Sequence, residues 1–475
     1  MSVDVFSFSC ASLAKAKLVG FKGTEHISRP YVFEIFFTVP SGTDVRAAVG
    51  DKATLTAARG DDREPMRWHG VFAKLRLLRH VDERVLYCGT LVPRLWRLRH
   101  CLRSNVATKQ NIKEFLTDTL KHGGLSEGDF RFHIDESSYP KEEFVAQYRE
   151  SHLEFFHRWL EREGLYYFFE HEEDENGKEI LVIVDDMGQH DAFGSSEPLR
   201  YFPSGAGDAS AGEGLHVFQC DYQALPADVL ITDYNYANPS APVEGDHAVS
   251  KNGMGQIRDY GYRVFDESEA KRLAAIKAQS LACREMVVRT GGNVMRLRAG
   301  YTFEISDLGA EELPTEYLPF EVRHAGSLAG ATADMSAMTG LQSEVTYHVE
   351  VQAVPKDVQY RAPQTSPWPR IYGFENAVVD GPAESIYAQI DDQGRYLVKF
   401  YFDASDLTDG VASTYIRMAQ PHGGASEGQH FPLRKGTEVM VAFQGGDPDR
   451  PLISGVVPNA THPSTVTANN HTHNV

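Results

Sequence analysis

One five-residue run has the types and spacing of a hydrolase nucleophile. Gly424-Ala425-Ser426-Glu427-Gly428 matches G-x-S-x-G, in which the serine lies on a tight turn between a strand and a helix. Here Phe431-Pro432 follows and strand-like sequence comes next, so no helix is expected to help build an oxyanion hole. A polar, glycine-rich loop is the better interpretation. A hydrolase that uses Ser426 remains the distant alternative.

Two pairs of histidines could bind a metal. His152 and His157 are five residues apart, about 140° around a helix, so they cannot reproduce the one-face pair of an H-E-x-x-H zinc site. They are interpreted as surface and interface residues. His471 and His473 alternate, so in a strand they would share a face, and a threefold axis would triple them. They are weak candidates for an axial metal, against the simpler interpretation of a polar strand facing solvent.

Other cofactor signals are missing. The acidic loop 172–178 has Asn176-Gly177 at roughly calcium-loop spacing, but Ile183 stands where the closing bidentate Glu should be. The five cysteines are scattered without a C-x-x-C pair, and no G-x-G-x-x-G or Walker lysine occurs. The sequence therefore predicts no catalytic residues and no metal, nucleotide or other cofactor.

Length and charge limit the possible partners. At 475 residues the chain is too long for one core, and three or four domains are expected. Residues 1–103 hold 17 Lys and Arg against 10 Asp and Glu, whereas the whole chain carries a net charge of −19. Most of the surface would repel nucleic acid. The basic end either faces an acidic partner or is a solvated arginine-rich face. The start of the chain has no secretory-signal pattern, so cytoplasmic synthesis is expected.

The first 187 residues divide into a β-barrel and an α/β module. Aromatic and β-branched runs at 31–39, 68–78 and 85–96 predict a β-barrel or sandwich over 1–103, taken here as a first barrel with a returning strand near 215–236. An Asn cap at Asn111, with Glu114 three residues later, opens a helix that ends at Gly123-Gly124. A capping box, Ser151 to Glu154, opens a second helix that ends at Gly164. These elements define the α/β module over 104–187.

The remaining chain predicts more β structure. A connecting segment with strands covers 188–256, and a second barrel with a helix from Asp266 covers 257–362. Prolines 363, 367 and 369 mark a boundary. Short strand-like runs at 372–379, 385–390, 395–402, 414–419, 439–443 and 452–457 suit an OB-fold over 370–460. Residues 371–460 hold 6 Lys and Arg against 12 Asp and Glu, so single-stranded nucleic acid is not the expected ligand.

The turn in the last hairpin is predicted to be structural. Asp447, Pro448, Asp449 and Arg450 follow two glycines, which supply positive φ, while proline fixes φ near the value a turn needs. The aspartates can accept backbone amides, and Arg450 can pair with a carboxylate.

Four stretches together resemble the VgrG family, the spike proteins of bacterial type VI secretion, and the related hubs of contractile phage tails. They are QYRESHLEFFHRWLEREGLYYFFEH (147–171), GRYLVKFYFD (394–403), TYIRMAQPHGG (414–424) and EVMVAFQGGDPDRPLISG (438–455). The family often has Trp in OB strands where this chain has Tyr401, Phe402 and Tyr415. The end NHTHNV resembles the root of a triple-stranded β-helix needle, which this chain is expected to lack.

The resemblance implies a fold that is mainly β with α+β insertions. It comprises two hub barrels with the α/β module, then the OB-fold, then the neck of a trimeric needle at 461–475. It also implies a non-enzymatic homotrimer that docks on the hexameric inner tube and on baseplate proteins, and that carries a tip protein and effectors through the needle. It would assemble in the cytoplasm, leave through the secretion apparatus, and meet a target membrane only by puncture. The hub of a contractile phage tail or related injection particle is the near alternative.

Overall fold

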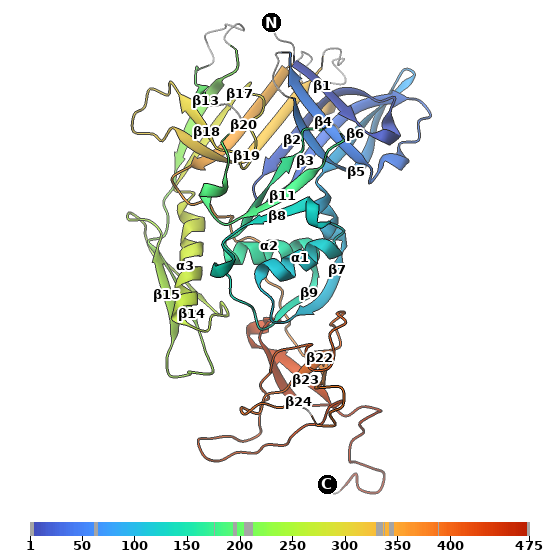
Figure 1. Cartoon of the computed structure of the whole chain (residues 1–475), viewed down its shortest axis with the longest axis vertical. Coiled ribbons are helices and arrows are strands. Elements are labelled where there is room, and N and C mark those ends of the chain that lie inside the picture. The colour runs from blue at the N-terminus through green and yellow to red at the C-terminus, as the bar shows by residue number, and fades with distance from the viewer. Residues whose placement is uncertain are drawn as a thin grey trace. The chain divides into compact units, whose positions relative to one another are not determined.

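A computed structural model describes residues 4–60, 65–174, 176–192, 197–203, 212–328, 336, 338–341, 346–387 and 389–472. The chain is mainly β with α+β insertions, as the sequence predicted (Figure 1). It divides into two compact units that are described separately. The first comprises Met1–Arg97, Gly124–Asp135 and Leu160–Thr365, and the second comprises Leu98–Gly123, Glu136–Trp159 and Ser366–Val475.

The first unit contains one 12-stranded sheet, and its first half forms a barrel. Phe6 and Phe21, from the two end strands of this half, pack with ring centroids 5.4 Å apart, so these two strands lie against each other. The expected strand at 85–96 is shorter than predicted, because Pro93 has no amide to continue the ladder. The six strands, in sheet order, are β1 (Asp4–Ser9), β4 (Lys52–Arg59), β5 (Met66–Val81), β6 (Arg84–Val92), β3 (Arg29–Pro40) and β2 (Lys17–His26).

The second half of the sheet forms the second barrel. A bridge between Tyr201 and Leu215 closes it, with the Phe202 amide donating to the Leu215 carbonyl at 2.9 Å. The two barrels are fused where β2 pairs with β19, over the register from His26 with Glu321 to Gly20 with Ser327. The strands are β19 (Glu316–Ser327), β20 (Thr346–Pro355), β17 (Met286–Gly292), β13 (Leu215–Tyr222), β18 (Phe303–Ser306) and β12 (Leu199–Arg200).

The strand expected near 215–236 to return to the first barrel does not do so. β13 pairs with β17 in the second barrel, and β14 (Asp228–Asp233) joins a separate sheet with β15 (Val243–Ala248) and β16 (Gln256–Tyr260). Glycine explains the pairing of β13: a Cβ on Gly292 would lie 2.0 Å from the Gly214 carbonyl oxygen, so the two backbones approach too closely for another residue. Alternation in one strand cannot identify such a partner.

Helix α3 (Glu267–Ala282) covers the separate three-stranded sheet. Its predicted start is confirmed, because the Asp266 side chain accepts from the Glu269 amide at 2.9 Å. Apolar residues of the helix and the sheet form one core, which includes Val229, Ile231, Leu273 and Ala274.

The region predicted as one α/β module contributes to both units. In the first unit, β8 (Phe130–His133), β11 (Glu179–Val184) and β10 (Tyr166–His171) form a three-stranded sheet. In the second unit, β7 (Leu102–Ala107) pairs with β9 (Val145–Ser151), beside α1 (Ile112–His122) and the first eight residues of α2 (His152–Glu163). The capping box at Asn111 is formed, and Gly123 caps the end of α1.

The OB-fold region of the second unit has a four-stranded sheet. The order is β22 (Val398–Phe400), β21 (Glu375–Val379), β23 (Glu438–Phe443) and β24 (Pro451–Val456). The expected strand at 414–419 is reduced to two isolated bridges, Ile416 with Tyr396 and Met418 with Ile453. In the expected strand at 385–390, residue 388 lies outside the described residues, and Tyr387 forms an isolated bridge with Arg434.

Short 3-10 helices complete the elements. They are η1 (Ala11–Leu13), η2 (Arg46–Ala48), η3 (Arg94–His100), η4 (Glu127–Asp129), η5 (Glu136–Ser138), η6 (Met187–Gln189) and η7 (Gln444–Gly446). Within the described residues, none of the helices is long and apolar enough to cross a membrane.

The described residues 461–472 form turns in this single chain. The Thr467 hydroxyl donates to Asn470 Oδ1 at 3.0 Å, and His471 Nδ1 lies 2.8 Å from the Ala468 carbonyl oxygen. No strand forms over the described residues 461–472 in this single chain, where no second strand is present to pair with them. The trimeric neck stays a prediction.

Candidate functional site: the buried polar network of α2 and the C-terminal hairpin

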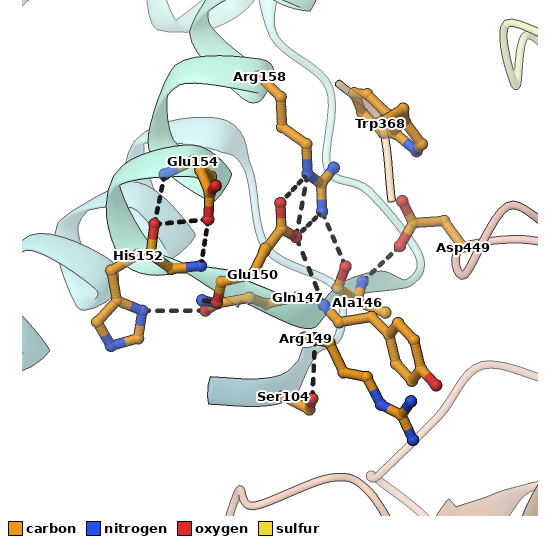
Figure 2. A network of polar contacts seen from close by, with 12 residues as sticks. Ser104, Ala146, Gln147, Arg149, Glu150, His152, Glu154, Arg158, Trp368 and Asp449 are labelled. Atoms are coloured by element: carbon orange, nitrogen blue, oxygen red, sulfur yellow. Dashed lines mark hydrogen bonds and ion pairs between the residues drawn. The ribbon is translucent and has the colours of Figure 1, made fainter. Parts of the chain in front are cut away.

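The start of α2 is fixed by reciprocal hydrogen bonds. The Glu154 amide donates to Ser151 Oγ at 3.2 Å, and the Ser151 amide donates to Glu154 Oε2 at 2.7 Å (Figure 2). This is the capping box that the sequence predicted. At the other end Gly164 has φ of 75°, the left-handed conformation of a helix stop. These two ends set where α2 begins and stops, and hence which of its residues share a face.

A buried ion pair connects β9 to α2. Arg158 donates from Nε to Glu150 Oε2 at 2.8 Å and from Nη2 to Glu150 Oε1 at 2.7 Å. Nη2 also donates to the Ala146 carbonyl oxygen at 2.9 Å (Figure 2). The Arg158 side chain is 1% exposed, and its guanidinium lies 4.2 Å from the ring centroid of Trp368. The carboxylate compensates the buried positive charge of Arg158, and the ring of Trp368 adds a cation–π contact.

Burial and charge act in opposite directions on this pair. Burial raises the pKa of the Glu150 carboxyl above its ordinary value, although the Arg158 guanidinium beside it lowers the pKa. The carboxylate thus depends on its partner to remain charged. A pair of this kind adds little net stability, but removing one member leaves the other buried and unpaired.

His152 belongs to the same network, contrary to the prediction that it lies at the surface. It is 2% exposed, and its Nδ1 lies 3.0 Å from Gln147 Oε1. Burial, together with smaller effects of His122 and Arg103, lowers the pKa of His152 to about 4. The Gln147 amide nitrogen donates to the Glu150 carbonyl oxygen at 2.9 Å, which leaves Oε1 to accept from His152. A neutral imidazole with a proton on Nδ1 fits this arrangement.

The predicted turn lies in the same unit and shares partners with the ion pair. Asp447 is 4% exposed, and its Oδ1 accepts from the Trp368 indole at 3.1 Å and from the Asp449 amide at 3.0 Å. The Asp449 carboxylate accepts from the Ala146 amide. The Arg450 amide donates to the Asp447 carbonyl oxygen at 2.9 Å.

Ala146 and Trp368 each contact both Arg158 and the hairpin turn. The Ala146 carbonyl binds Arg158 while its amide binds Asp449 (Figure 2). The Trp368 ring faces Arg158 while its indole nitrogen binds Asp447. Sequence reasoning missed Glu150, Arg158 and Trp368. The sequence could have indicated Arg158, because it lies among the aromatic residues of α2, and an arginine that is buried with such residues requires a partner for its charge.

An apolar core accompanies this polar network within the second unit. Residues of β9 and its flank pack with the OB-fold strands in one cluster. Its members include Val106, Phe144, Ala146, Tyr148, Ala377, Val379, Val398, Phe400, Val439, Val441 and Ile453. The ring centroids of Tyr148 and Phe402 are 5.2 Å apart. The second unit thus joins hub-module strands to the OB-fold through both polar and apolar contacts.

The structure does not assemble a nucleophile around Ser426. The residue is exposed, and in the described part of the chain its hydroxyl donates to Glu427 Oε2 at 3.1 Å. Gly423 and Gly428 form an isolated antiparallel bridge, and residues 429–443, which follow directly, contain no helix. The strand-turn-helix geometry of a hydrolase elbow is not present at this loop.

The metal candidates are not brought together with further ligands. His471 is exposed, and His473 lies outside the described residues. Among the residues that the structure describes, no group of three or more His, Cys, Asp or Glu side chains is placed to hold a metal ion.

Fused β-barrels followed by an OB-fold define the class of tail-hub proteins. The family model described as "Phage tail baseplate hub (GPD)" matches residues 24–330, and the chain belongs to this family. A second model, "Type VI secretion system/phage-baseplate injector OB domain", matches residues 387–457. The predicted resemblance and the OB-fold are thereby confirmed.

Curated relatives carry the name of the spike family. Type VI secretion system spike protein VgrG1b of Pseudomonas aeruginosa is 26% identical over 444 residues, covering 92% of this chain and 58% of the relative. VgrG1a of the same organism is 27% identical, covering 83% of this chain and 60% of the relative. The actin cross-linking toxin VgrG1 of Vibrio cholerae is 28% identical over 81% of this chain and 34% of the toxin. The chain thus spans less than two thirds of each of these relatives.

Solved structures share the fold. The E. coli c3393 protein, described as a type VI secretion component similar to T4 phage tail proteins gp27 and gp5, aligns with a TM-score of 0.68 at 19% identity. The alignment covers 95% of this chain and 100% of that one. A chain from a PdpA-VgrG complex aligns with a TM-score of 0.64 at 8% identity, covering 98% of this chain and 89% of that one. A prophage MuSo2 tail protein of Shewanella oneidensis has a TM-score of 0.52 at 11% identity, covering 76% and 100%.

Proposed function

We propose that this chain is a non-enzymatic spike and hub protein of a type VI secretion system. The observation that carries the proposal is the order of modules: a baseplate hub over 24–330 is followed in the same chain by an injector OB domain over 387–457. The names of the P. aeruginosa relatives support the same role.

In this role three copies form a ring that caps the hexameric inner tube, and the OB-folds stand above the ring under a needle. The finer parts of the proposal are the trimer, contacts with the tube and baseplate proteins, and the carriage of a tip protein and effectors. A solved complex of PdpA with VgrG supports a partner-binding role. Release through the secretion apparatus and passage of a target membrane by puncture belong to the same proposal.

The buried polar network has a mechanical role in this proposal. During puncture, axial load on the OB-fold has to reach the hub without unfolding the hairpin at Asp447. Shared use of Ala146 and Trp368 by Arg158 and by the turn couples the hairpin to α2. The turn Asp447, Pro448, Asp449 and Arg450 therefore acts as a structural joint in the proposal.

Copurification tests the proposal. A tagged chain expressed in its own host should retain an inner-tube protein, and deletion of its gene should abolish release of that tube protein into the medium. Retention of phage tail-sheath and tape-measure proteins instead, with structural genes of a prophage beside its gene, would favour the phage-tail alternative. Hydrolysis of ester or peptidoglycan substrates that disappears in Ser426→Ala would favour the distant hydrolase alternative.

A further inference from the structure

Strand β16 forms one edge of the small three-stranded sheet in the first unit, the sheet to which β14 and β15 belong in Figure 1. It pairs with β14 in parallel, from Asp228 with Gln256 to Thr232 with Tyr260, and the register is continuous. On its other side, no strand of the described chain pairs with it. Neither the proposed spike role nor the joint at Asp447 uses this edge.

Alternate backbone groups of β16 are directed away from β14. At the end of the strand, the Gly261 amide donates to the Thr232 carbonyl oxygen at 3.1 Å, so the odd-numbered residues face β14. Because neighbouring residues of a strand direct their amide and carbonyl groups to opposite sides, the even-numbered residues face outward. These are Gln256, Arg258 and Tyr260, and their backbone groups have no further hydrogen bond within the described chain.

The outward groups can be reached from solvent. All three even-numbered residues of β16 are exposed, and Tyr260 is 72% exposed. Met254, two residues before the strand, is 79% exposed. Ile257 instead packs against the core that the sheet forms with α3. The open edge is thus accessible along its length and is flanked in the chain by two large apolar side chains.

The charge on this edge selects the kind of strand that can pair with it. Exposed edges are commonly blocked by proline, a bulge or a charged side chain, and β16 has neither proline nor bulge. Its one outward charge is Arg258, whose ion pair with Glu244 is exposed and 3.9 Å long. Two antiparallel copies of β16, in the register of greatest overlap, would bring Arg258 opposite itself, which destabilises a sheet. An acidic residue at that position would be complementary.

We propose that the open edge of β16 receives an extended segment of a partner protein, which adds a fourth strand to the sheet and places an acidic residue opposite Arg258. The outward amides and carbonyls supply main-chain hydrogen bonds to the added strand. Arg258 selects the charge of the segment, and the exposed ring of Tyr260 packs against a β-branched or aromatic neighbour on it.

Hydrogen exchange of the full chain, measured by mass spectrometry on the fragment 255–261, tests the proposal. The probe is the peptide acetyl-Thr-Thr-Val-Glu-Val-Thr-Thr-amide, and the control peptide has Lys in place of Glu. At millimolar concentration, the glutamate peptide should slow exchange of the outward amides at least about fivefold. It should bind about threefold more tightly than the lysine peptide. Unchanged exchange with both peptides would overturn strand addition, and equal affinity would overturn the acidic preference.

Variants of one strand separate binding from folding. Arg258→Pro removes an outward amide, so it should abolish protection by the glutamate peptide and leave the melting temperature nearly unchanged. Ile257→Pro is the matched control, because it removes an amide that faces β14 and should lower the melting temperature. Arg258→Glu keeps the backbone intact and should reverse the preference toward the lysine peptide.

Two further results would overturn the proposal. If Arg258→Glu still preferred the glutamate peptide, Arg258 would not select the segment. If exchange of the outward amides were already slow in the purified wild-type chain, and Arg258→Pro lowered the mass measured by light scattering, the occupant of the edge would be a second copy of this chain instead of a partner protein.

Discussion

Two buried carboxylates, one in each unit, are held in different ways. In the second unit, Glu150 accepts charged hydrogen bonds from Arg158, at 2.7 and 2.8 Å. In the first unit, Glu25 is also buried among aromatic rings, but its hydrogen-bond donors are neutral: the Trp68 indole and the Ala299 amide, the latter at 3.2 Å. Arg298 acts on Glu25 through its charge.

The histidine beside Glu25 makes the contrast sharper. His324 Nε2 lies 4.0 Å from Glu25 Oε1 and makes no hydrogen bond within the described chain, while its Nδ1 lies 2.7 Å from the Tyr347 hydroxyl. Burial, together with a smaller effect of the Arg298 charge, lowers the pKa of His324 to about 3. The ion pair at α2 therefore depends on its cation, whereas the barrel site depends on a histidine that stays neutral.

Breaking the ion pair should give the largest effect. Arg158→Met leaves Glu150 buried without a cation, and we expect a loss of about 3 to 5 kcal/mol in the free energy of unfolding, measured in urea. The double variant Arg158→Met, Glu150→Gln should recover a large part of the loss, because no charge remains buried. If the single variant Arg158→Met changed the free energy of unfolding by less than about 0.5 kcal/mol, Glu150 would not depend on a cation and would resemble Glu25 in this respect.

The shared residues around the pair extend the comparison to the hairpin. Asp447→Ala removes the acceptor of the Trp368 indole and of the Asp449 amide, so we expect a loss of about 2 kcal/mol. Asp447→Asn keeps an oxygen at this position and should lose less. Differential scanning calorimetry measures both. Equal stability of the alanine variant and the wild type, with partner binding abolished, would make the turn a recognition site instead of a structural joint.

The barrel site should respond to pH. His324 has a lowered pKa in the folded chain, so only the unfolded chain takes up its proton as pH falls from about 6.5. The stability that neutral His324 contributes to the folded state is fully present above about pH 6.5 and is lost progressively as the pH falls toward about 3. Between pH 7.5 and pH 5.5, the free energy of unfolding should fall by about 1.4 kcal/mol less in His324→Gln than in the wild type. Parallel pH profiles of the two proteins would contradict the neutral-histidine account.

A substitution in the exposed loop at Ser426 should have a much smaller effect on stability than substitutions at the two buried sites. Ser426→Ala should change the free energy of unfolding by less than about 0.5 kcal/mol, since its hydroxyl contacts only the neighbouring Glu427 side chain within the described residues. Secretion of the inner-tube protein should be unaffected. Loss of a hydrolytic activity in this variant would contradict the non-enzymatic proposal.

Local signals in the sequence predicted local structure well. The capping boxes at Asn111 and Ser151, the helix stop at Gly164 and the cap at Asp266 are all formed, because each depends on residues within one turn of chain. The family motifs further predicted the hub and OB regions that the family models match.

Contacts between distant residues could not be predicted in the same way. The seam between the barrels pairs Gly20 with Ser327, and no pattern within either strand identifies the other as its partner. The burial of His152 follows from Gln147 and from the packing of α1 and β7, which helical spacing alone does not contain. In the expected strand at 385–390, residue 388 lies outside the described residues, and Tyr387 forms an isolated bridge with the distant Arg434.

The mass of the full chain in solution tests the central proposal most directly. Multi-angle light scattering after size exclusion should give three times the chain mass of 52.9 kDa if the protein is a trimeric spike and hub. The trimer peak should grow at the expense of the monomer as protein concentration rises. A mass of one chain at every concentration would contradict the account.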